Sequence, residues 1–431
     1  MLSPHDADLA RRDSDIPGLG LLLDPEAFAT ALRTVLPDAG VGAAKARYVR
    51  YKPGTNCLVA YRLQVAGVET DVYAKAYRAG TRGKLRKAQE RLTLHGCLGA
   101  GGVVLSDAVT AVFAFPNDYK LDTLTCLADA TSRQRLFATL LPDRPDLWEA
   151  SIRGLRYKPE RRYVARMITP TGQSALVKLH TEGDYPAASC AATAFSSRGL
   201  LRVARRLGHC NRHHAVVLEW LPGRPLAEAI RAARVSPTAA HTVGAALAEL
   251  HMQSSQELEP LTREAEAASL LAAADAVAAV CPRLAESTWD LALRIASGLR
   301  EVSYYSCPIH GDFSADQVLF TGESVAILDL DAAAQGDPVR DLGSFAAWLE
   351  REVMRGDLTA GPAAALTETL LEGYCAATGC DLPVHFGLYV AAGLLQVAPH
   401  AFRYREPDWP ARTQAILERA EEIVRNGCVH P

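Results

Sequence analysis

The chain has 431 residues, of which 49% are hydrophobic and 22% are charged, and these values are typical of a globular protein of two or three domains. Its apolar runs are shorter than the ~20 residues of a membrane span, and its ten cysteines include no C-x-x-C pair, which disfavours a membrane protein, a zinc site and a disulfide framework. The net charge of −3 combines a basic first half with an acidic second half, without the aromatic-interleaved basic stripe of a nucleic-acid surface.

The first 115 residues predict a helical lead-in followed by an antiparallel meander. Pro25 after Asp24 is typical of a helix start, and Phe28 would lie on the apolar face of that helix. Alternating segments rich in β-branched or aromatic residues then predict strands. The predicted strands are 47–54, 57–63, 71–77, 103–105 and 111–115, and the predicted helix is 84–94.

The same order of elements recurs 106 residues later. The tetrapeptide RYKP at 50–53 reappears at 156–159, and Pro116 and Pro222 are separated by the same offset. A mostly helical connection, 121–141, joins the two copies. In the second copy the predicted strands include 164–167, 175–179 and 216–222, and the predicted helix is 186–198. We therefore predict an internal duplication, whose period is too long for a solenoid.

Only the second copy is followed by a long region of helical spacing with few strand formers. The predicted helices are 227–234, 237–252, 262–302 with a break at Pro282, 344–355, 362–378, 384–398 and 410–425. The segment 308–342, which reads PIHGDFSADQVLFTGESVAILDLDAAAQGDPVRDL, interrupts these helices. Its apolar runs 318–320 and 325–328 predict two short strands joined by a turn at Thr321-Gly322-Glu323.

This predicted hairpin would bring several side-chain oxygens together. Asp312 and Gln317 lie on the loop that enters its first strand, and Asp329 follows its second strand. Such an arrangement suits phosphoryl transfer, in which a carboxylate accepts a hydroxyl proton and oxygen ligands hold the magnesium that screens the phosphates.

The hairpin segment also resembles a known catalytic loop. His310-Gly311-Asp312, followed five residues later by Gln317, resembles the H-x-D-x-x-x-x-N loop of the protein-kinase-like fold, and Leu328-Asp329 resembles the metal-binding Asp that follows it. Gly336-Asp337-Pro338 with Asp341-Leu342 resembles the aminoglycoside phosphotransferase family of that fold more than protein kinases. Gln replaces the usual Asn, and in this the chain resembles maltokinases.

The resemblance covers roughly residues 150–431, and the hinge-like stretch 219–226 adds to it. It implies an α+β, bilobal protein-kinase-like fold, which here would carry an extra N-terminal duplicated small-lobe domain. We expect the extra domain, acting as a cap, over 1–149, the kinase-like N-lobe with an antiparallel sheet plus a helix over 150–222, and the helical C-lobe with the catalytic hairpin over 223–431.

The resemblance assigns roles to the residues of the loop. Asp312 would be the general base, or would orient the acceptor hydroxyl, and Gln317 and Asp329 would be the magnesium ligands. His310 and Asp341 would brace the loop by hydrogen bonds. Two further acids lie nearby: Asp337 with Pro338 would cap a helix start, whereas Asp331 is either a further metal ligand or an exposed turn acid.

The resemblance also implies a nucleotide site. Lys178 lies in an apolar strand and needs a partner for its charge, which the nucleotide phosphates would supply. The loop that would cover the phosphates has no glycine, so its basic residues Lys158 and Arg161 would act by charge instead. Glu219-Trp220-Leu221 would offer backbone groups to the adenine edge, and the tryptophan suits base stacking and core packing equally well.

The acid that usually partners this lysine is missing. The family carries a Glu on the next helix, but 186–198 contains no acid, so Glu182 or Asp184 would have to substitute. In the first copy, Lys75 and Glu90 could pair with each other. We therefore expect the lysine of the second copy, and not that of the first, to serve the nucleotide.

These observations favour a phosphotransferase that uses ATP and Mg²⁺ and acts on a hydroxyl of a small molecule, such as a sugar, an aminocyclitol or a related metabolite. Residues 1–239 have a charge balance of +12 and residues 240–431 of −15, which suits a polyphosphate in the first half and a cationic acceptor in the second. Two alternatives stay open: a Ser/Thr peptide kinase of a biosynthetic pathway, and a pseudokinase that serves as a binding module.

The surroundings of the protein are predicted from its N-terminus and its composition. The N-terminal sequence is acidic and polar, where a signal peptide would be basic and then apolar, so we expect a cytoplasmic location. We expect neither a nucleic-acid nor a membrane partner. The oligomeric state stays open, and a dimer contact is one of the roles considered for the first copy.

Overall fold

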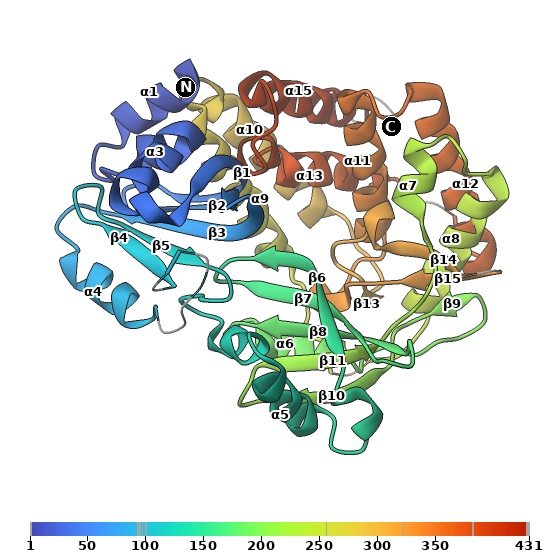
Figure 1. Ribbon diagram of the computed structural model, residues 1–431. Helices are drawn as coiled ribbons and strands as arrows, with labels where there is room; N and C mark the ends of the chain where they lie inside the picture. The colour runs from blue at the N-terminus through green and yellow to red at the C-terminus, as the bar shows by residue number, and fades with distance from the viewer. Residues whose placement is uncertain are drawn as a thin grey trace. The chain divides into compact units, whose positions relative to one another are not determined.

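The computed structural model describes residues 2–92, 96, 98–99, 101–255, 257–321, 323–381 and 383–427 (Figure 1). The chain divides into two compact units. Unit 1 comprises 1–185, 208–217 and 402–407, and unit 2 comprises 186–207, 218–401 and 408–431. None of the described helices is both long enough and apolar enough to cross a membrane.

Unit 1 begins with the predicted helical lead-in. Its helices are α1 (Pro4–Arg12), α2 (Leu19–Leu23) and α3 (Pro25–Val35). The carboxylate of Asp24 accepts hydrogen bonds from the N–H groups of Glu26 and Ala27 at 3.1 and 3.2 Å, which confirms the helix start predicted at Pro25. The late segment 402–407 also belongs to this unit, where Arg405 donates to both carboxylate oxygens of Asp6 at 3.0 and 2.6 Å.

The first sheet is antiparallel throughout and has the strand order β1-β2-β3-β5-β4. Its strands are β1 (Val41–Lys52), β2 (Asn56–Val65), β3 (Val68–Tyr77), β4 (Gly102–Leu105) and β5 (Thr110–Ala114), and α4 (Arg82–Glu90) lies between β3 and β4 in sequence. Of the helix predicted over 84–94, the described part ends at Glu90 and residues 91 and 92 are not helical; residues 93 and 94 lie outside the described part of the chain.

Helices cover both faces of the first sheet. Successive side chains of β2 point to opposite faces, so β2 contacts the helices on both. Leu58 packs in a buried cluster with Leu85 and Ala88 of α4. On the other face, the ring of Tyr61 stacks on Phe28 of α3, with 4.2 Å between ring centroids. The lead-in helices therefore form part of the core of this first copy.

The second sheet repeats the strand order of the first. Read from β6, the order is β6-β7-β8-β11-β10, which corresponds one to one with β1-β2-β3-β5-β4. Its strands are β6 (Ser151–Lys158), β7 (Arg162–Ile168), β8 (Ser174–His180), β10 (Arg206–Cys210) and β11 (Ala215–Glu219). Lys75 lies opposite Leu58 in the first sheet, and Lys178 lies opposite Val164 in the second. The predicted duplication is confirmed.

The connection between the two sheets is helical, as predicted. It consists of η2 (Asp122–Leu127), α5 (Ala130–Leu140) and η3 (Pro145–Leu147). Asp129 caps α5, because its carboxylate accepts a hydrogen bond from the N–H of Ser132 at 2.9 Å.

Unit 2 is mainly helical. The helices that lie wholly or partly in unit 2 are α6 (Tyr185–Ala191), α7 (Leu226–Arg231), α8 (Pro237–His251), α9 (Arg263–Val280), α10 (Ala285–Glu301), α11 (Val339–Arg355), α12 (Ala360–Thr378), α13 (Phe386–Val397), α14 (His400–Arg403) and α15 (Trp409–Gly427). The break predicted at Pro282 is present as η4 (Pro282–Leu284). Helices α8 and α12 approach each other closely at Gly244, where a Cβ would lie 1.9 Å from the carbonyl oxygen of Leu370.

The helix predicted over 186–198 is wrong beyond Ala191. Gly199 has a φ of +48°, and the carboxylate of Glu249 on α8 accepts hydrogen bonds from the N–H groups of Leu200 and Leu201 at 3.2 and 2.9 Å. A Cβ at Gly199 would lie 2.3 Å from this carboxylate. The segment therefore leaves the helix and forms the short strand β9 (Leu201–Arg202).

The predicted hairpin is present in unit 2 as β14 (Val318–Thr321) and β15 (Ser324–Ile327), and Gly322 of its predicted turn lies outside the described residues. A four-stranded sheet forms in the order β12-β14-β15-β9, with β12 at Arg224–Pro225. Beside the predicted catalytic loop, β13 (Cys307–Ile309) pairs with β16 (Ala334–Gly336). Buried Val318, Val325 and Ile327 anchor the hairpin in the core of unit 2.

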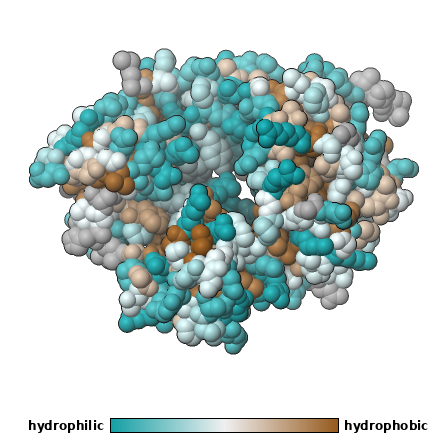
Figure 2. Space-filling model, turned by 45° about the vertical axis from the view of Figure 1, so that its right-hand side comes forward, coloured by the Kyte–Doolittle hydropathy of each residue, from teal (hydrophilic) through white to brown (hydrophobic). Residues whose placement is uncertain are grey.

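Hydrophilic residues cover most of the face shown in Figure 2, and hydrophobic residues gather there in small, separate groups. Among the residues that the structure describes, the exposed large hydrophobic residues are scattered along the chain: Val35, Val68, Leu155, Met252, Leu293, Tyr305 and Val384. Scattered apolar residues of this kind are normal on protein surfaces.

Candidate active site

The predicted catalytic loop of unit 2 starts at His310, directly after β13, and needs a glycine at its second position. Gly311 has a φ of +82°, and a Cβ there would lie 2.2 Å from the carbonyl oxygen of Ala332. A residue with a side chain would strain the backbone and collide with the neighbouring segment. Asp312 follows this turn, and its side chain is exposed, as a residue that receives a proton from a substrate has to be.

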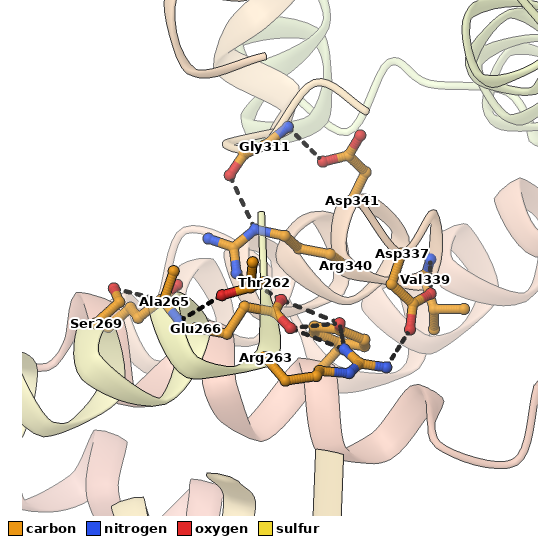
Figure 3. A network of polar contacts seen from close by, with 12 residues as sticks. Thr262, Arg263, Ala265, Glu266, Ser269, Gly311, Asp337, Val339, Arg340 and Asp341 are labelled. Atoms are coloured by element: carbon orange, nitrogen blue, oxygen red, sulfur yellow. Dashed lines mark hydrogen bonds and ion pairs between the residues drawn. The ribbon is translucent and has the colours of Figure 1, made fainter. Parts of the chain in front are cut away.

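Asp341 of α11 holds the start of this loop (Figure 3). Its carboxylate accepts hydrogen bonds from the N–H groups of His310 and Gly311 at 2.6 and 2.9 Å, and it lies 3.0 Å from Nε2 of His251. Burial opposes the charge of Asp341, but the contacts with His251 and His310 outweigh burial and hold the pKa of Asp341 below its ordinary value. The predicted bracing role of Asp341 is confirmed.

His310 links the segment of the predicted base, Asp312, to the segment of the predicted metal ligand, Asp329. Its Nε2 lies 2.8 Å from the carbonyl oxygen of Leu328, and its Nδ1 accepts a hydrogen bond from the N–H of Asp312 at 3.3 Å. Because Nδ1 accepts, Nε2 carries the proton and donates it to the carbonyl. One fully buried ring therefore fixes the backbone of Asp312 and of the residue before Asp329, which confirms the predicted bracing role of His310.

Gln317 and Asp329 lie on segments that are joined by a backbone hydrogen bond. Asp329 follows β15 with a φ of +61°, and the N–H of Leu328 donates to the carbonyl oxygen of Gln317 at 2.8 Å. The amide oxygen Oε1 of Gln317 accepts a hydrogen bond from Oγ of Ser314 at 3.0 Å. An amide oxygen has two lone pairs, so this bond leaves one of them for a metal.

The chemistry of these donors fits Mg²⁺, which prefers carboxylate and carbonyl oxygens and usually takes only one or two ligands from the protein. Gln317 and Asp329 provide one oxygen donor of each kind, and both lie at the open end of the hairpin, one before β14 and one after β15. Among the described residues, no group of three or more His, Cys, Asp or Glu side chains could hold a metal by itself. A magnesium ion at this place would therefore complete its shell with water and phosphate oxygens.

A network of charges between α9 and α11 supports the loop from below (Figure 3). Arg340 donates from Nε to the carbonyl oxygen of Gly311 at 3.2 Å and lies 3.2 Å from a carboxylate oxygen of Glu266. Arg263 bridges Glu266 and Asp337 at 2.8 and 2.9 Å. The sequence analysis missed Arg263, Glu266 and Arg340.

Asp337 caps the start of α11, as predicted. Its Oδ1 accepts a hydrogen bond from the N–H of Val339 at 3.0 Å, and its Oδ2 lies 3.0 Å from Nε2 of His385. Burial works against the charged form, but the hydrogen bonds of His385, Val339 and Arg263 outweigh it and lower the pKa of Asp337. Asp331 lies half-buried in η6 (Leu330–Ala332), and its role stays open.

The predicted adenine hinge lies in unit 2, at the end of β11. Glu219, Trp220 and Leu221 are all partly buried. The N–H of Glu219 donates to the carbonyl oxygen of Arg205 at 2.8 Å, so this particular group is engaged within the protein. The other backbone groups of the stretch stay candidates for the adenine edge.

The remaining predicted nucleotide residues belong to unit 1. Lys178 lies within β8 and is only 5% exposed. Lys158 and Arg161 flank the turn between β6 and β7, which is closed by a hydrogen bond from the N–H of Arg161 to the carbonyl oxygen of Lys158 at 3.0 Å. Asp184, one of the acids considered for Lys178, accepts a hydrogen bond from Thr181 at 2.8 Å and lies 3.7 Å from Arg161.

The same turn contains a residue that the sequence analysis did not single out. Glu160 has a φ of +56°, is buried, and places its two carboxylate oxygens 2.9 and 2.7 Å from Nζ of Lys75. Arg50 donates to Glu160 at 2.8 Å. The prediction that Lys75 pairs with Glu90 is therefore wrong.

Two further contacts explain this pairing. The N–H of Glu160 donates to Oδ2 of Asp118 at 2.9 Å, and the hydroxyl of Tyr157 donates to the same oxygen at 2.7 Å, so the turn of the second copy is fixed against the first. Glu90 instead lies 3.8 Å from Arg86, one helical turn away on the exposed face of α4. Burial lowers the pKa of Lys75, although Glu160 acts in the opposite direction. The signal in the sequence was an acid in a turn that otherwise carries basic residues.

The chain is similar to known proteins in sequence pattern and in fold. Residues 137–383 match the model of the phosphotransferase enzyme family, APH. A solved choline kinase from Cryptosporidium parvum Iowa II is similar in structure, with 9% identity and a TM-score of 0.50, over 70% of this chain and 98% of that chain. At this identity the similarity shows the fold alone.

Two other solved structures are similar at slightly lower scores. A choline/ethanolamine kinase family protein from Mesorhizobium loti has 17% identity and a TM-score of 0.48, over 68% of this chain and 95% of that chain. A Plasmodium vivax ethanolamine kinase has 9% identity and a TM-score of 0.49, over 70% and 99%. No curated protein matches the sequence.

Proposed function

Since the chain belongs to the phosphotransferase enzyme family and is a kinase with an alcohol group as acceptor, we propose that it uses ATP and Mg²⁺ to phosphorylate a hydroxyl of a small molecule. The acceptor class that we propose is a sugar, an aminocyclitol or a related metabolite. The observation that carries this proposal is the His310 ring, which ties the loop of Asp312 to the segment of Asp329.

In this proposal Asp312 accepts the proton of the acceptor hydroxyl, or orients that hydroxyl for attack. Its exposed side chain and fixed backbone support this role, because a general base must reach the substrate without moving its own main chain. In phosphoryl transfer, the protein mainly positions the reacting groups and stabilises the charge of the transition state. The network below the loop, from Arg340 to Asp337, supplies that rigidity.

We propose that Gln317 and Asp329 hold the magnesium ion, which would neutralise phosphate charge when bound. Lys178 would bind the nucleotide phosphates, because it lies within β8 at the strand position that the resemblance assigns to the phosphate-binding lysine. Lys158 and Arg161 would add positive charge to the phosphates. The stretch Glu219–Leu221 would contact the adenine through the backbone groups that are not already engaged.

The charge of the chain supports a cationic acceptor. Residues 240–431 carry 27 acidic against 12 basic residues, and this range includes Asp312, Gln317 and Asp329. An acidic surface attracts a cationic molecule and raises its local concentration. Hydroxylated amines are therefore the first acceptors to test.

The experiment is a screen of acceptors with the purified full chain, Mg²⁺ and ATP. Slow turnover of ATP should rise when a suitable hydroxylated amine or sugar is added, and Asp312→Ala should reduce the acceptor-dependent part by about 10²–10⁴-fold. Asp357→Ala removes an exposed acid of the same unit outside the catalytic loop and serves as the control. Wild-type turnover in Asp312→Ala would overturn the assignment.

The same screen separates the two alternative functions. Transfer to Ser or Thr of a peptide, without transfer to any small molecule, would favour a peptide kinase. Binding of nucleotide with no turnover for any acceptor would favour a pseudokinase. Neither alternative is supported by an observation as specific as the linked pair of Asp312 and Asp329.

A further inference from the structure

A polar cavity of about 660 Å³ lies within unit 1, outside the loop of Asp312. Its walls come from both copies of the duplication. The first copy contributes the ends of β1 and β3 and the segment 119–123 after β5. The second copy contributes the segment 179–184, which begins at the end of β8, and the turn 212–214 between β10 and β11.

The cavity is strongly basic. Seven Lys and Arg side chains line it, against four carboxylates, an excess of three positive charges. The basic residues are Arg50, Lys52, Lys75, Arg91, Lys120, Arg161 and Arg212, and the acidic residues are Asp122, Glu160, Glu182 and Asp184. The basic first half of the sequence therefore concentrates charge at one defined place.

Part of this charge is already neutralised by the protein. Glu160 pairs with Lys75 and Arg50 at 2.7 and 2.8 Å, and Arg91 pairs with Asp122 at 2.6 Å. The fourth pair, between Arg161 and Asp184, is longer at 3.7 Å. These pairs leave three of the seven basic residues to be accounted for.

The surplus charge lies on Lys52, Lys120 and Arg212. All three are exposed, and none forms an ion pair with any residue in the part of the chain that the structure describes. They come from three different segments that line the cavity, rather than following one another along a helix or strand. A ligand that meets all three must carry several negative charges.

We propose that this cavity is a second binding site, for a small molecule that carries two or more phosphate groups. The volume lies within the ~300–1,000 Å³ of small-molecule sites, and lysine and arginine are the usual partners of phosphate oxygens. The ring of Tyr119, which has Lys75 5.8 Å and Arg91 5.9 Å from its centroid, adds a flat surface to the wall.

This site is distinct from the proposed catalytic site. Asp312, Gln317, Asp329 and Lys178 do not line the cavity, and Arg161 is the one proposed nucleotide residue that does. Glu160 occupies the position at which an anion would otherwise reach Lys75, so the ligand binds at the rim, to the surplus cations. Binding at exposed charges weakens as salt screens them.

The test is isothermal titration of the full chain with inorganic pyrophosphate in the presence of EDTA, which keeps the catalytic metal ligands empty. The variant K52A/K120A/R212A should bind pyrophosphate at least tenfold more weakly than the wild type. The matched control K45A/K87A/R135A removes two exposed lysines and one exposed arginine outside the cavity, and it should bind within twofold of the wild type.

Each other outcome counts against the site. Unchanged affinity in K52A/K120A/R212A overturns it, as does an equal loss in the control, which would indicate non-specific attraction. A loss in Lys178→Ala without a loss in K52A/K120A/R212A would place the pyrophosphate at the nucleotide site instead. Acceptor-dependent turnover, measured on the same proteins, reports on the proposed function separately, because none of the three substituted residues belongs to the catalytic loop.

Discussion

The ammonium group of Lys75 lies 2.7 and 2.9 Å from the two carboxylate oxygens of Glu160, and the two residues belong to different copies of the duplication. Lys75 corresponds by strand position to Lys178, the proposed nucleotide lysine of the second copy. In the first copy, then, a carboxylate of the protein takes the place that we propose for nucleotide phosphate in the second copy.

Glu160→Gln should destabilise the protein by about 3–5 kcal/mol, because it leaves the buried Lys75 and the partly buried Arg50 without their counter-charge. Lys75→Met should cost less, because Arg50 still neutralises Glu160. Urea denaturation measures both values. Glu90→Gln, which breaks an exposed pair with Arg86, is the control and should change stability by less than ~1 kcal/mol. A larger loss in Lys75→Met than in Glu160→Gln would contradict this ranking.

Lys178→Ala should weaken binding of the Mg²⁺-nucleotide at least tenfold, because it removes the buried cation proposed for the phosphates. Lys75→Met should bind nucleotide like the wild type at a temperature at which it is folded, because Lys75 is held by Glu160. Calorimetric titration gives both affinities. The opposite pattern, with nucleotide binding lost only in Lys75→Met, would assign the nucleotide to the first copy.

Asp329→Asn should weaken the binding of Mg²⁺-nucleotide while the protein stays folded, because it removes a negative charge from a partly exposed loop position. Gln317→Asn should be tolerated if the amide oxygen alone matters. It should lower activity if the bond from Ser314 to Oε1 sets the reach of that oxygen. Titration with Mn²⁺ observed by electron spin resonance measures the metal directly, and equal metal affinity in Asp329→Asn would remove this residue from the site.

Gly311→Ala should abolish acceptor-dependent turnover, because the added Cβ would lie 2.2 Å from the carbonyl oxygen of Ala332 at a φ of +82°. Gly361→Ala is the matched control: nothing lies within 4 Å of its added Cβ in α12, and alanine is the better helix former there. Activity and thermal stability are measured for both proteins. Full activity of Gly311→Ala would show that the loop tolerates another backbone path.

Asp341 should make the stability of unit 2 dependent on acidic pH. The pKa of Asp341 in the folded protein lies below the ordinary value of 3.8. Its contribution to the free energy of unfolding is therefore complete above pH 3.8 and is lost as the pH falls through the pKa of the folded state. Asp341→Asn should therefore be less stable than the wild type at pH 6, and this difference should shrink towards pH 3. Urea midpoints at the two pH values test the prediction, and a difference that grows on acidification would contradict it.

The elements that could be predicted from the sequence are those with a local pattern. The hairpin of β14 and β15 follows from two short apolar runs, and the duplication follows from a tetrapeptide that returns at a fixed offset. The roles of His310, Asp337 and Asp341 could be predicted because a motif ties each of them to its neighbours.

The contacts that escaped prediction join distant parts of the chain. Glu160 and Lys75 are 85 positions apart, and neither shows in its own segment that the other is its partner. Arg263 and Asp337 are 74 positions apart. Arg263 lies at the start of a helix, where an arginine is ordinarily a solvated surface residue. Its burial results from contacts with distant segments, which the neighbouring sequence does not indicate. The likeness of Gln317 to the maltokinase residue stays a prediction.

The bonds that Asp118 forms with the turn of the second copy have a practical consequence for anyone who shortens this gene. A fragment that begins at residue 137 would keep every position matched by the family model, yet it would lose Asp118, Lys75 and Arg50 together. The carboxylate of Glu160 would then lack both of its cationic partners, and Arg405 would lose its ion pair with Asp6 as well. The chain should therefore not be truncated between the two copies. The shortest stable fragment has to include both copies of the duplication.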